Sequence, residues 1–337
     1  MIDPADSAAP PPDYSPPLIF GRVLDGKGGG RKVDWDEARA WQPGVKGEVL
    51  WVHCDRAHDD VFDWLHEQLG VPESTVEALT SDETRPRAFR EEEWLITILR
   101  GINFNPGAEP EDMISMQMLA DKCRVITLRR RRLHSPREVL ADIDRRHGPH
   151  SAGDLVVELA ETMVGKMSSS IVDMNDTLDD LEENEDDYET EFIQDQITDI
   201  RRNCLSLKRH MSPQREALRD IGRAAVPWLN KQNRRDLRDT IDRLSRFLED
   251  IDVSKESALV LQDDLNARAN AQSNRTNYIL SLVAAIFLPL GFVTGLLGIN
   301  VGGMPGVNDV HAFRDTVLML IAIFAGQIAI FKWLKWF

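Results

Sequence analysis

Two long apolar stretches near the end of the chain limit what it can fold into. Residues 278–298, YILSLVAAIFLPLGFVTGLLG, contain no charged side chain, and residues 316–337, TVLMLIAIFAGQIAIFKWLKWF, carry charge only close to their end. A helix of roughly 20 residues crosses a hydrocarbon core of about 30 Å. The sequence therefore predicts two membrane-spanning helices. The alternative, two buried helices in a soluble protein, is disfavoured because the remainder of the chain is too polar to surround them.

Charge near the two stretches predicts their orientation. Lys332 and Lys335 stand beside Trp333 and Trp336, a basic and aromatic edge typical of a cytoplasmic interface. The connection at 299–315 has no basic excess. Two spans place both termini on one side, so we expect both in the cytoplasm.

Composition narrows the classes of partner. The 337-residue chain has a formal net charge of −16, which argues against a nucleic-acid partner and fits a solvated surface or a cationic partner. Cys54, Cys123 and Cys204 are scattered and form no CxxC pair, as expected of reduced thiols. Residues 1–17 are rich in proline and alanine, and we expect a disordered lead.

Residues 18–150 have the pattern of an α/β domain in the cytoplasm. Apolar runs rich in β-branched residues predict strands, and the spacing of apolar residues over 59–70 predicts an amphipathic helix. The strands are expected at 17–25, 47–55, 92–104, 112–121 and 122–131. The glycine-rich stretch 26–32, GKGGGRK, lacks the ending of a phosphate loop, so a hairpin turn is the preferred interpretation.

The stretch 53–60, HCDRAHDD, gathers residue types that bind metals. The alternation of a strand sends His53 and Cys54 to opposite faces, and no second ligand pair of zinc spacing accompanies them. A structural role is favoured over a metal site.

Residues 151–231 predict an acidic helix hairpin and a connector. The helical pattern is interrupted by EENEDDYET, so the carboxylates gather at the tip of the hairpin. A solvated tip and a collector that raises the local cation concentration are both consistent with this pattern. The acidic tip comprises Asp179, Asp180, Glu182, Glu183, Glu185, Asp186 and Asp187.

Residues 232–298 predict one continuous helix that runs into the first span. Apolar residues step by three and four from Leu237 to Leu265, which indicates packing against other helices. At 1.5 Å per residue the helix is on the order of 100 Å long. Such a length cannot be buried within one subunit, so we expect an oligomer.

A stripe of amides marks one face of this helix before the membrane. Asn266, Asn270, Asn274 and Asn277 step by four, four and three, and small or aliphatic residues continue the stripe into the span. Neutral amide oxygens suit a cation or its water shell, so the stripe is a candidate pore lining. The competing interpretation is a set of amides that fixes helix register. The pore-lining candidates are Asn270, Asn274, Asn277, Leu280, Ala284, Leu288 and Gly291.

The first span also contains Pro289. Proline removes the helical hydrogen bond to the Ala285 carbonyl and is expected to kink or loosen the helix there.

The end of this helix carries a resemblance. Gly298-Ile299-Asn300 closes the first span, ETRPR and EDMISMQML occupy 83–87 and 111–119, and a long helix precedes the span. Together these features, over 18–337, resemble the CorA family of divalent-cation transporters, and within it the zinc-transporting ZntB branch. The resemblance implies a homopentamer in a bacterial inner membrane. It also implies an α/β cytoplasmic domain, a long stalk helix whose span lines the pore, and a second span outside.

The resemblance also implies roles for residues. Gly298, Ile299 and Asn300 would form the outer mouth, with Asn300 holding a hydrated cation, and Leu280 and Leu288 would be apolar constrictions. In the magnesium branch the outer loop carries Met-Pro-Glu-Leu, whereas this chain has MPGV at 304–307. The missing glutamate favours zinc. Asp309 and His311 are the loop residues that remain candidates for cation capture.

The predicted function is therefore uptake of divalent cations, with zinc preferred, and the resemblance implies help from the proton gradient. The spans contain no cysteine or histidine, so passage of a partly hydrated ion is favoured over a tight zinc site. No cofactor is expected besides the transported ion. The alternatives are a magnesium or cobalt channel and a membrane-anchored metal-sensing scaffold. An enzyme is not expected, because no nucleophile motif, phosphate loop or paired metal ligands are found.

Overall fold

The computed structural model describes residues 16–44, 47–109, 112–184, 188–299 and 309–334. Most of the predicted disordered lead lies outside these ranges, as do Asn300, the loop stretch 304–307 and part of the acidic tip. The chain divides into two units, one up to Leu261 and one from Gln262. Each unit is described by itself.

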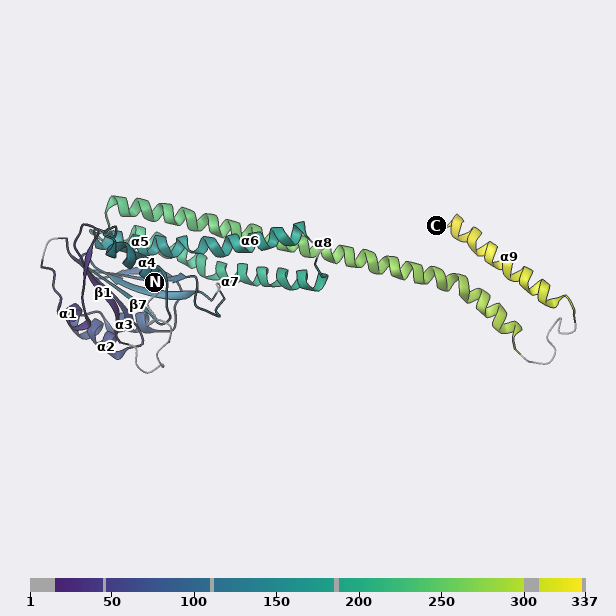
Figure 1. The fold of residues 1–337 in the computed structure, drawn as a ribbon, viewed down its shortest axis with the longest axis horizontal. Helices are drawn as coiled ribbons and strands as arrows, with labels where there is room; N and C mark the ends of the chain where they lie inside the picture. Colours follow the sequence, from purple (N-terminus) through teal and green to yellow (C-terminus); the bar gives the residue numbers. More distant parts are fainter. Residues whose placement is uncertain (1–15, 45–46, 110–111, 185–187, 300–308, 335–337) are drawn as a thin grey trace. The chain divides into compact units, whose positions relative to one another are not determined.

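A mixed seven-stranded sheet forms the centre of the first unit (Figure 1). Its strand order is β2-β1-β3-β7-β6-β5-β4; β3 and β7 pair in parallel, and the other neighbours pair antiparallel. The strands predicted from sequence are present, and β2 and β4 are additional. The bounds are β1 Leu18–Leu24, β2 Gly30–Lys32, β3 Val49–Asp55, β4 Arg87–Glu91, β5 Trp94–Gly101, β6 Ile114–Ala120 and β7 Arg124–Arg129.

The glycine-rich stretch forms the turn between β1 and β2, as predicted. Asp25 Oδ1 accepts hydrogen bonds from the backbone N–H groups of Lys27 and Gly29 at 2.8 and 3.0 Å. Gly28 has φ of 90°, and a Cβ there would lie 2.8 Å from the Arg146 carbonyl oxygen. The glycines therefore serve a tight turn beside the residues that follow α4 Ser135–Asp144, and the turn donates its N–H groups to its own aspartate.

Short helices cover one face of the sheet. They are α1 Trp35–Ala40, α2 Asp59–Asp63 with a π-helical turn at Trp64–Gln68, and α3 Glu73–Thr80. The helix predicted over 59–70 is thus an α-helix that widens into a π turn. Trp64 and Leu65 in that turn are buried against the side chains of β3 that point to this face.

Longer helices cover the opposite face. They are α4 Ser135–Asp144, α5 Ala152–Gly165 and the first-unit helix α7 Thr190–Arg223, which contains Pro213. α5 contacts β5 and β7, and α7 contacts β4 and β5. Because both faces of the sheet are covered, every residue of β3 except Asp55 is buried, which explains its nearly continuous apolar sequence.

Three long helices continue side by side from the sheet (Figure 1). They are α6 Met167–Glu183, α7 and the first part of α8 Lys231–Leu297. Each buries one stripe at three- and four-residue steps, as helices packed in a bundle do. Lys208 on α7 pairs with Asp252 on α8, and the Ser254 hydroxyl on α8 hydrogen-bonds Asn175 on α6. The buried stripe of α8 comprises Asn233, Leu237, Thr240, Leu244, Leu248, Ile251, Ser254, Ala258, Leu261 and Leu265.

The second unit holds the rest of α8 and α9 Ala312–Trp333. Both helices are long and apolar enough to cross a membrane, and their apolar side chains are almost all exposed. α8 has 67 residues and covers nearly the whole range predicted for the long helix. The partly covered positions of α8, such as Ala285, Pro289 and Val293, fall on one side of the helix.

Gln327 of α9 compensates for Pro289. Proline leaves the Ala285 carbonyl without its helical donor. The Gln327 side-chain Nε2 donates to that carbonyl at 3.2 Å and approaches the Ile286 carbonyl at 3.4 Å. An unsatisfied carbonyl is costly inside a bilayer, so this contact stabilises the kink site and ties the two apolar helices together.

Glu158 on α5 is a half-buried carboxyl group among acids. Burial, together with the charges of Asp142, Glu161 and Asp154, raises its pKa to about 7. The folded state therefore binds a proton between about pH 4.5 and pH 7 that the unfolded chain has released.

We predict that the free energy of unfolding falls as pH rises through this window. Glu158→Gln should raise the thermal unfolding midpoint of the detergent-solubilised protein at pH 8 and leave it nearly unchanged at pH 5. Glu256→Gln, at an exposed position on α8, is the control and should show no such pH dependence. A Glu158→Gln midpoint that tracks wild type at pH 8 would contradict the assignment.

We predict that Gln327→Leu destabilises the folded protein by about 1 kcal/mol, the size of a hydrogen bond between membrane helices. In a Pro289→Ala background the backbone supplies its own donor to Ala285, so the same substitution should cost clearly less. A double-mutant cycle of unfolding free energies measures the difference. Equal costs in the two backgrounds would show that Gln327 does not act through this carbonyl.

Candidate functional site

The amide stripe lies on an exposed face of α8. Asn266, Asn270, Asn274 and Asn277 are all exposed, and none belongs to the stripe that packs in the first unit. The amides therefore do not satisfy one another or a neighbouring helix within one chain. The pore-lining role of these amides stays a prediction, and their side chains are exposed in the structure.

The aliphatic part of the stripe is equally open. Leu280 is 67 % and Leu288 is 72 % exposed, and Ala284 and Gly291 are exposed as well. At 100° per residue Leu280 and Ala284 lie on the opposite side of the helix from Pro289, which faces α9, whereas Leu288 lies about 60° from Ala285. One side of α8 thus packs on α9, while Leu280 and Ala284 are free to face something else.

The glycines of the span leave room for a further helix. A Cβ on Gly291 or Gly295 would have no heavy atom within 4 Å. Glycine in a membrane helix commonly permits close approach of another helix. Among the described residues, α9 comes no closer than 4 Å to either added Cβ, although Gly291 borders a groove between α8 and α9.

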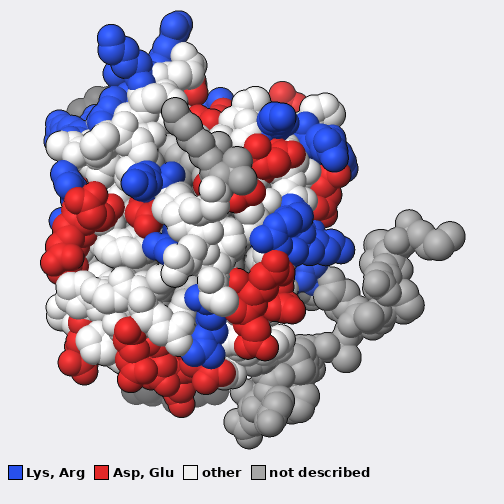
Figure 2. Space-filling model, turned by 90° about the vertical axis from the view of Figure 1, so that its left-hand side faces the viewer, with Lys and Arg blue, Asp and Glu red and all other residues white. Residues whose placement is uncertain are grey.

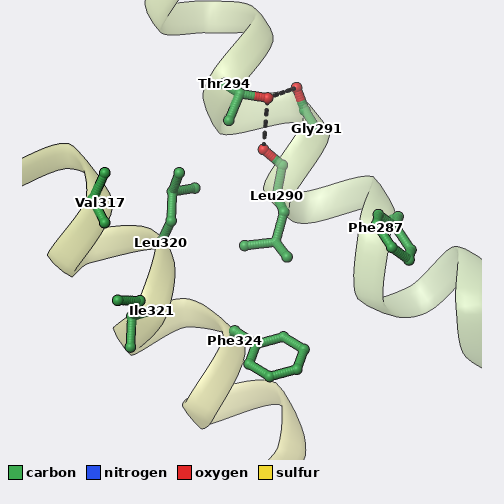
Figure 3. Close-up of a pocket in the computed structure, with 8 residues that line it drawn as sticks. All are labelled: Phe287, Leu290, Gly291, Thr294, Val317, Leu320, Ile321 and Phe324. Atoms are coloured by element: carbon green, nitrogen blue, oxygen red, sulfur yellow. Dashed lines mark hydrogen bonds between the residues drawn. The ribbon is translucent and has the colours of Figure 1, made fainter. Parts of the chain in front are cut away.

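An apolar groove of about 440 Å³ lies between α8 and α9 (Figure 3). The one hydroxyl in its lining, that of Thr294, donates back to the carbonyls of Leu290 and Gly291, each at 3.1 Å. The groove therefore offers no free donor toward its interior and no charged group for an ion. Its lining residues are Phe287, Leu290, Gly291, Thr294, Val317, Leu320, Ile321 and Phe324.

The predicted outer mouth is described in part. α8 ends at Leu297, and the Gly298 N–H still donates to the Thr294 carbonyl at 2.9 Å. Ile299 is exposed, and Asn300 lies outside the described residues. Asp309 and His311 are both exposed, and the His311 N–H donates to Asp309 Oδ1 at 2.9 Å in the turn that starts α9. A turn between residues two apart forms this hydrogen bond by itself, so the bond is no evidence for a cation-binding site.

The described part of the acidic tip forms the last turn of α6. Asp179, Asp180, Glu182 and Glu183 are exposed there, and Asp180 accepts hydrogen bonds from the Asn184 amide and the Tyr188 hydroxyl, each at 2.8 Å. Carboxylates at a helix C-terminus are disfavoured by the helix dipole, and a cation nearby would offset this. Both interpretations of the tip remain open.

The stretch around His53 is a structural feature. His53 and Cys54 are fully buried on opposite faces of β3, and burial lowers the pKa of His53 well below its usual value. The Thr127 hydroxyl donates to the Val52 carbonyl, so His53 Nδ1, 2.9 Å away, is the donor to Thr127 Oγ1. Within the described ranges no cluster of three or more histidine, cysteine or acidic side chains has the arrangement of a metal site.

Charge on the surface of the first unit is mixed. Figure 2 shows acidic and basic side chains in separate patches on one face, with no continuous basic surface there.

Sequence reasoning missed Gln327. It is the only amide side chain in the second apolar stretch, and a lone amide in such a stretch usually has a partner within the membrane. That signal, read together with Pro289, would have identified the contact.

Comparisons with known proteins agree over most of the chain. The family model described as CorA-like Mg2+ transporter protein matches residues 46–335. The divalent cation transporter CmaX of Pseudomonas aeruginosa is 36 % identical over 321 residues, which cover 95 % of this chain and 96 % of that protein. The zinc transport protein ZntB of Yersinia enterocolitica is 33 % identical over 321 residues, which cover 94 % and 95 %.

Solved structures show the same architecture. The full-length CmaX structure matches with a TM-score of 0.82 at 35 % identity and covers 95 % of this chain and 98 % of that one. The CorA magnesium transporter of Methanocaldococcus jannaschii, at 17 % identity, shares the fold with a TM-score of 0.77 over 93 % and 98 % of the two chains. The fold of this chain is thus shared with these structures, and the chain belongs to the CorA-like Mg2+ transporter family.

Proposed function

We propose that this protein transports divalent cations across a membrane, with zinc preferred, through a pore that several copies line with α8. One observation carries the proposal. The amide stripe and most of its aliphatic continuation are exposed along α8, and Leu280 and Ala284 lie on the opposite side of the helix from Pro289, which faces α9. A helix that packs one side on its neighbour and leaves an amide-bearing side open is suited to line a shared axis.

The chemistry of the stripe suits a hydrated divalent ion. Amide oxygens accept hydrogen bonds from the water shell of a cation and carry no charge that would trap it. Asn270, Asn274 and Asn277 would form successive neutral rings, and Leu280 and Leu288 would narrow the path. Asn300 would hold the ion at the outer mouth.

Oligomerisation follows from the same geometry. One copy of α8 encloses nothing, so a path requires several copies around an axis. The open surface at Gly291 and Gly295 would accept a neighbouring helix. We propose a homopentamer, as the family resemblance implies.

Two observations favour zinc over magnesium as the transported ion: the names of the relatives and the sequence of the loop between the two apolar helices. The relatives named ZntB are zinc transport proteins, and the loop sequence at 304–307 lacks the glutamate of the magnesium branch. Magnesium is the second candidate, because the matching family model carries that ion in its description.

The proposed location is a bacterial inner membrane with both termini in the cytoplasm. An inside-negative potential contributes about 2.3 kcal/mol per charge per 100 mV, and a divalent ion feels it twice. Uptake is therefore the favoured direction.

We predict that the purified protein in liposomes carries zinc faster than magnesium or cobalt. Flux is measured with an ion-sensitive dye inside the liposomes, with and without a pH gradient. Faster magnesium than zinc flux would assign the protein to the second candidate. Absence of flux for every divalent ion would instead favour a membrane-anchored scaffold.

We predict that the stripe and the outer mouth control this flux. Asn300→Ala should abolish zinc flux, and Asn274→Ala or Asn277→Ala should reduce it at least several-fold, because each removes a ring of amides. Gln272→Ala is the matched control, since Gln272 is an exposed amide on the other side of α8. Equal effects at 272 and 274 would indicate that the stripe does not line the path. Size-exclusion chromatography verifies that each variant keeps its oligomeric state.

A further inference from the structure

A polar pocket of about 290 Å³ lies in the first unit, at an edge of the sheet. Four arginines and two aspartates line it, so its lining carries an excess of positive charge in a chain of net charge −16. These residues are Arg56, Arg100, Arg130, Arg131, Asp82 and Asp112.

The topology of the sheet brings these arginines together. β3 and β7 are parallel, so Arg56 and Arg130, which follow them directly, meet at the same edge. β5 and β7 both run antiparallel to β6, so Arg100 near the end of β5 and Ser115 near the start of β6 reach that edge too. In α/β folds the carboxyl ends of parallel strands are where ligands bind.

One carboxylate serves two of the guanidinium groups. Arg56 and Arg130 both donate to Asp82 Oδ1, at 2.8 and 2.6 Å. The Arg56 side chain is only 5 % exposed, whereas that of Asp82 is 78 % exposed. Burial lowers the pKa of Arg56, and the charge of Arg130 lowers it further against the opposing effects of Asp82 and Asp55. The two like charges are therefore held close together through one shared, exposed carboxylate.

Arg100 adds a positive charge to the pocket, and it donates to uncharged hydrogen-bond acceptors. It donates to the carbonyls of Thr84 and Met113 at 3.0 and 2.8 Å and to the Thr84 hydroxyl. Among the described residues no ion pair joins it to a carboxylate. Burial, together with Arg209, lowers its pKa. The pKa of the neighbouring His210 is lowered to about 4 by burial, Arg100 and Arg209, so the positive potential extends into α7.

We propose that this pocket binds the phosphate group of a small anion, either inorganic phosphate or the end of a nucleotide. Guanidinium groups match the oxygens of a phosphate with paired hydrogen bonds. Arg56, Arg130 and Arg131 would approach the anion from the β3–β7 side and Arg100 from β5. A volume of about 290 Å³ is at the small end of ligand sites, which excludes a polymer. The anion relieves the repulsion among the arginines and competes with Asp82 for Arg130.

Direct binding to the full-length protein tests the proposal. Inorganic phosphate and ATP are titrated separately by calorimetry in metal-free buffer at low salt. Saturable binding of either anion, weakened by added sodium chloride, is expected. ATP binding that is much tighter than phosphate binding identifies a nucleotide, and similar affinities identify phosphate. Absence of saturable binding for both anions overturns the proposal.

Two substitutions with opposite expected effects locate the site. Arg131→Gln, at an exposed position, should weaken binding about tenfold, the effect of one charge-assisted hydrogen bond. Asp82→Asn should tighten binding, because it frees Arg56 and Arg130 from their carboxylate; misfolding does not produce that result. Arg202→Gln and Asp199→Asn, which alter an exposed ion pair on α7, are the matched controls. An unchanged affinity in both pocket variants overturns the assignment of the site.

Discussion

α8 is one continuous helix whose first part suits water and whose last part suits a lipid bilayer. Its first part buries a stripe from Asn233 to Leu261 and contacts α6 and α7, and the amides that follow are exposed among the described residues. A helix in water needs one apolar stripe to pack, whereas a helix in a bilayer gains nothing from hiding apolar side chains. The change of pattern along α8 therefore separates a segment that packs within its own chain from one whose open face, in our proposal, packs against another copy.

Backbone satisfaction is the second demand on this helix. Water can hydrate a free carbonyl outside the membrane, but within the hydrocarbon a donor must come from protein. Pro289 creates such a free carbonyl at Ala285, and Gln327 supplies the donor from α9. The carbonyl that Pro289 leaves without a helical donor in α8 thereby forms a specific hydrogen bond with α9. The contact positions Pro289 on the side of α8 that faces α9, which leaves Leu280 and Ala284 on the open side.

Much of this architecture follows from local patterns. The apolar stretches, the heptad spacing of α8 and the alternating strands depend on neighbours a few residues apart, and these elements are present where the sequence predicts them. The parallel pairing of β3 with β7 joins segments about seventy residues apart, and no local pattern encodes it. The π turn at Trp64–Gln68 and the edge strand β4 depend on tertiary packing in the same way. In the candidate site, the spacing of the amides was enough to predict that they share one face. The contact between Gln327 and the carbonyl freed by Pro289 could be found only from the packing of α9 on α8.

The distribution of charge separates the two kinds of ion that this chain handles in our proposals. The amide stripe is neutral, so it can pass a divalent cation without holding it. Exposed carboxylates gather in the first unit at the end of α6, where a solvated tip and a collector of cations both fit them. Within that same acidic unit the sheet edge gathers four arginines around two aspartates. The four guanidinium groups outnumber the two aspartates that line the pocket, and an anion of the kind we propose would reduce their mutual repulsion.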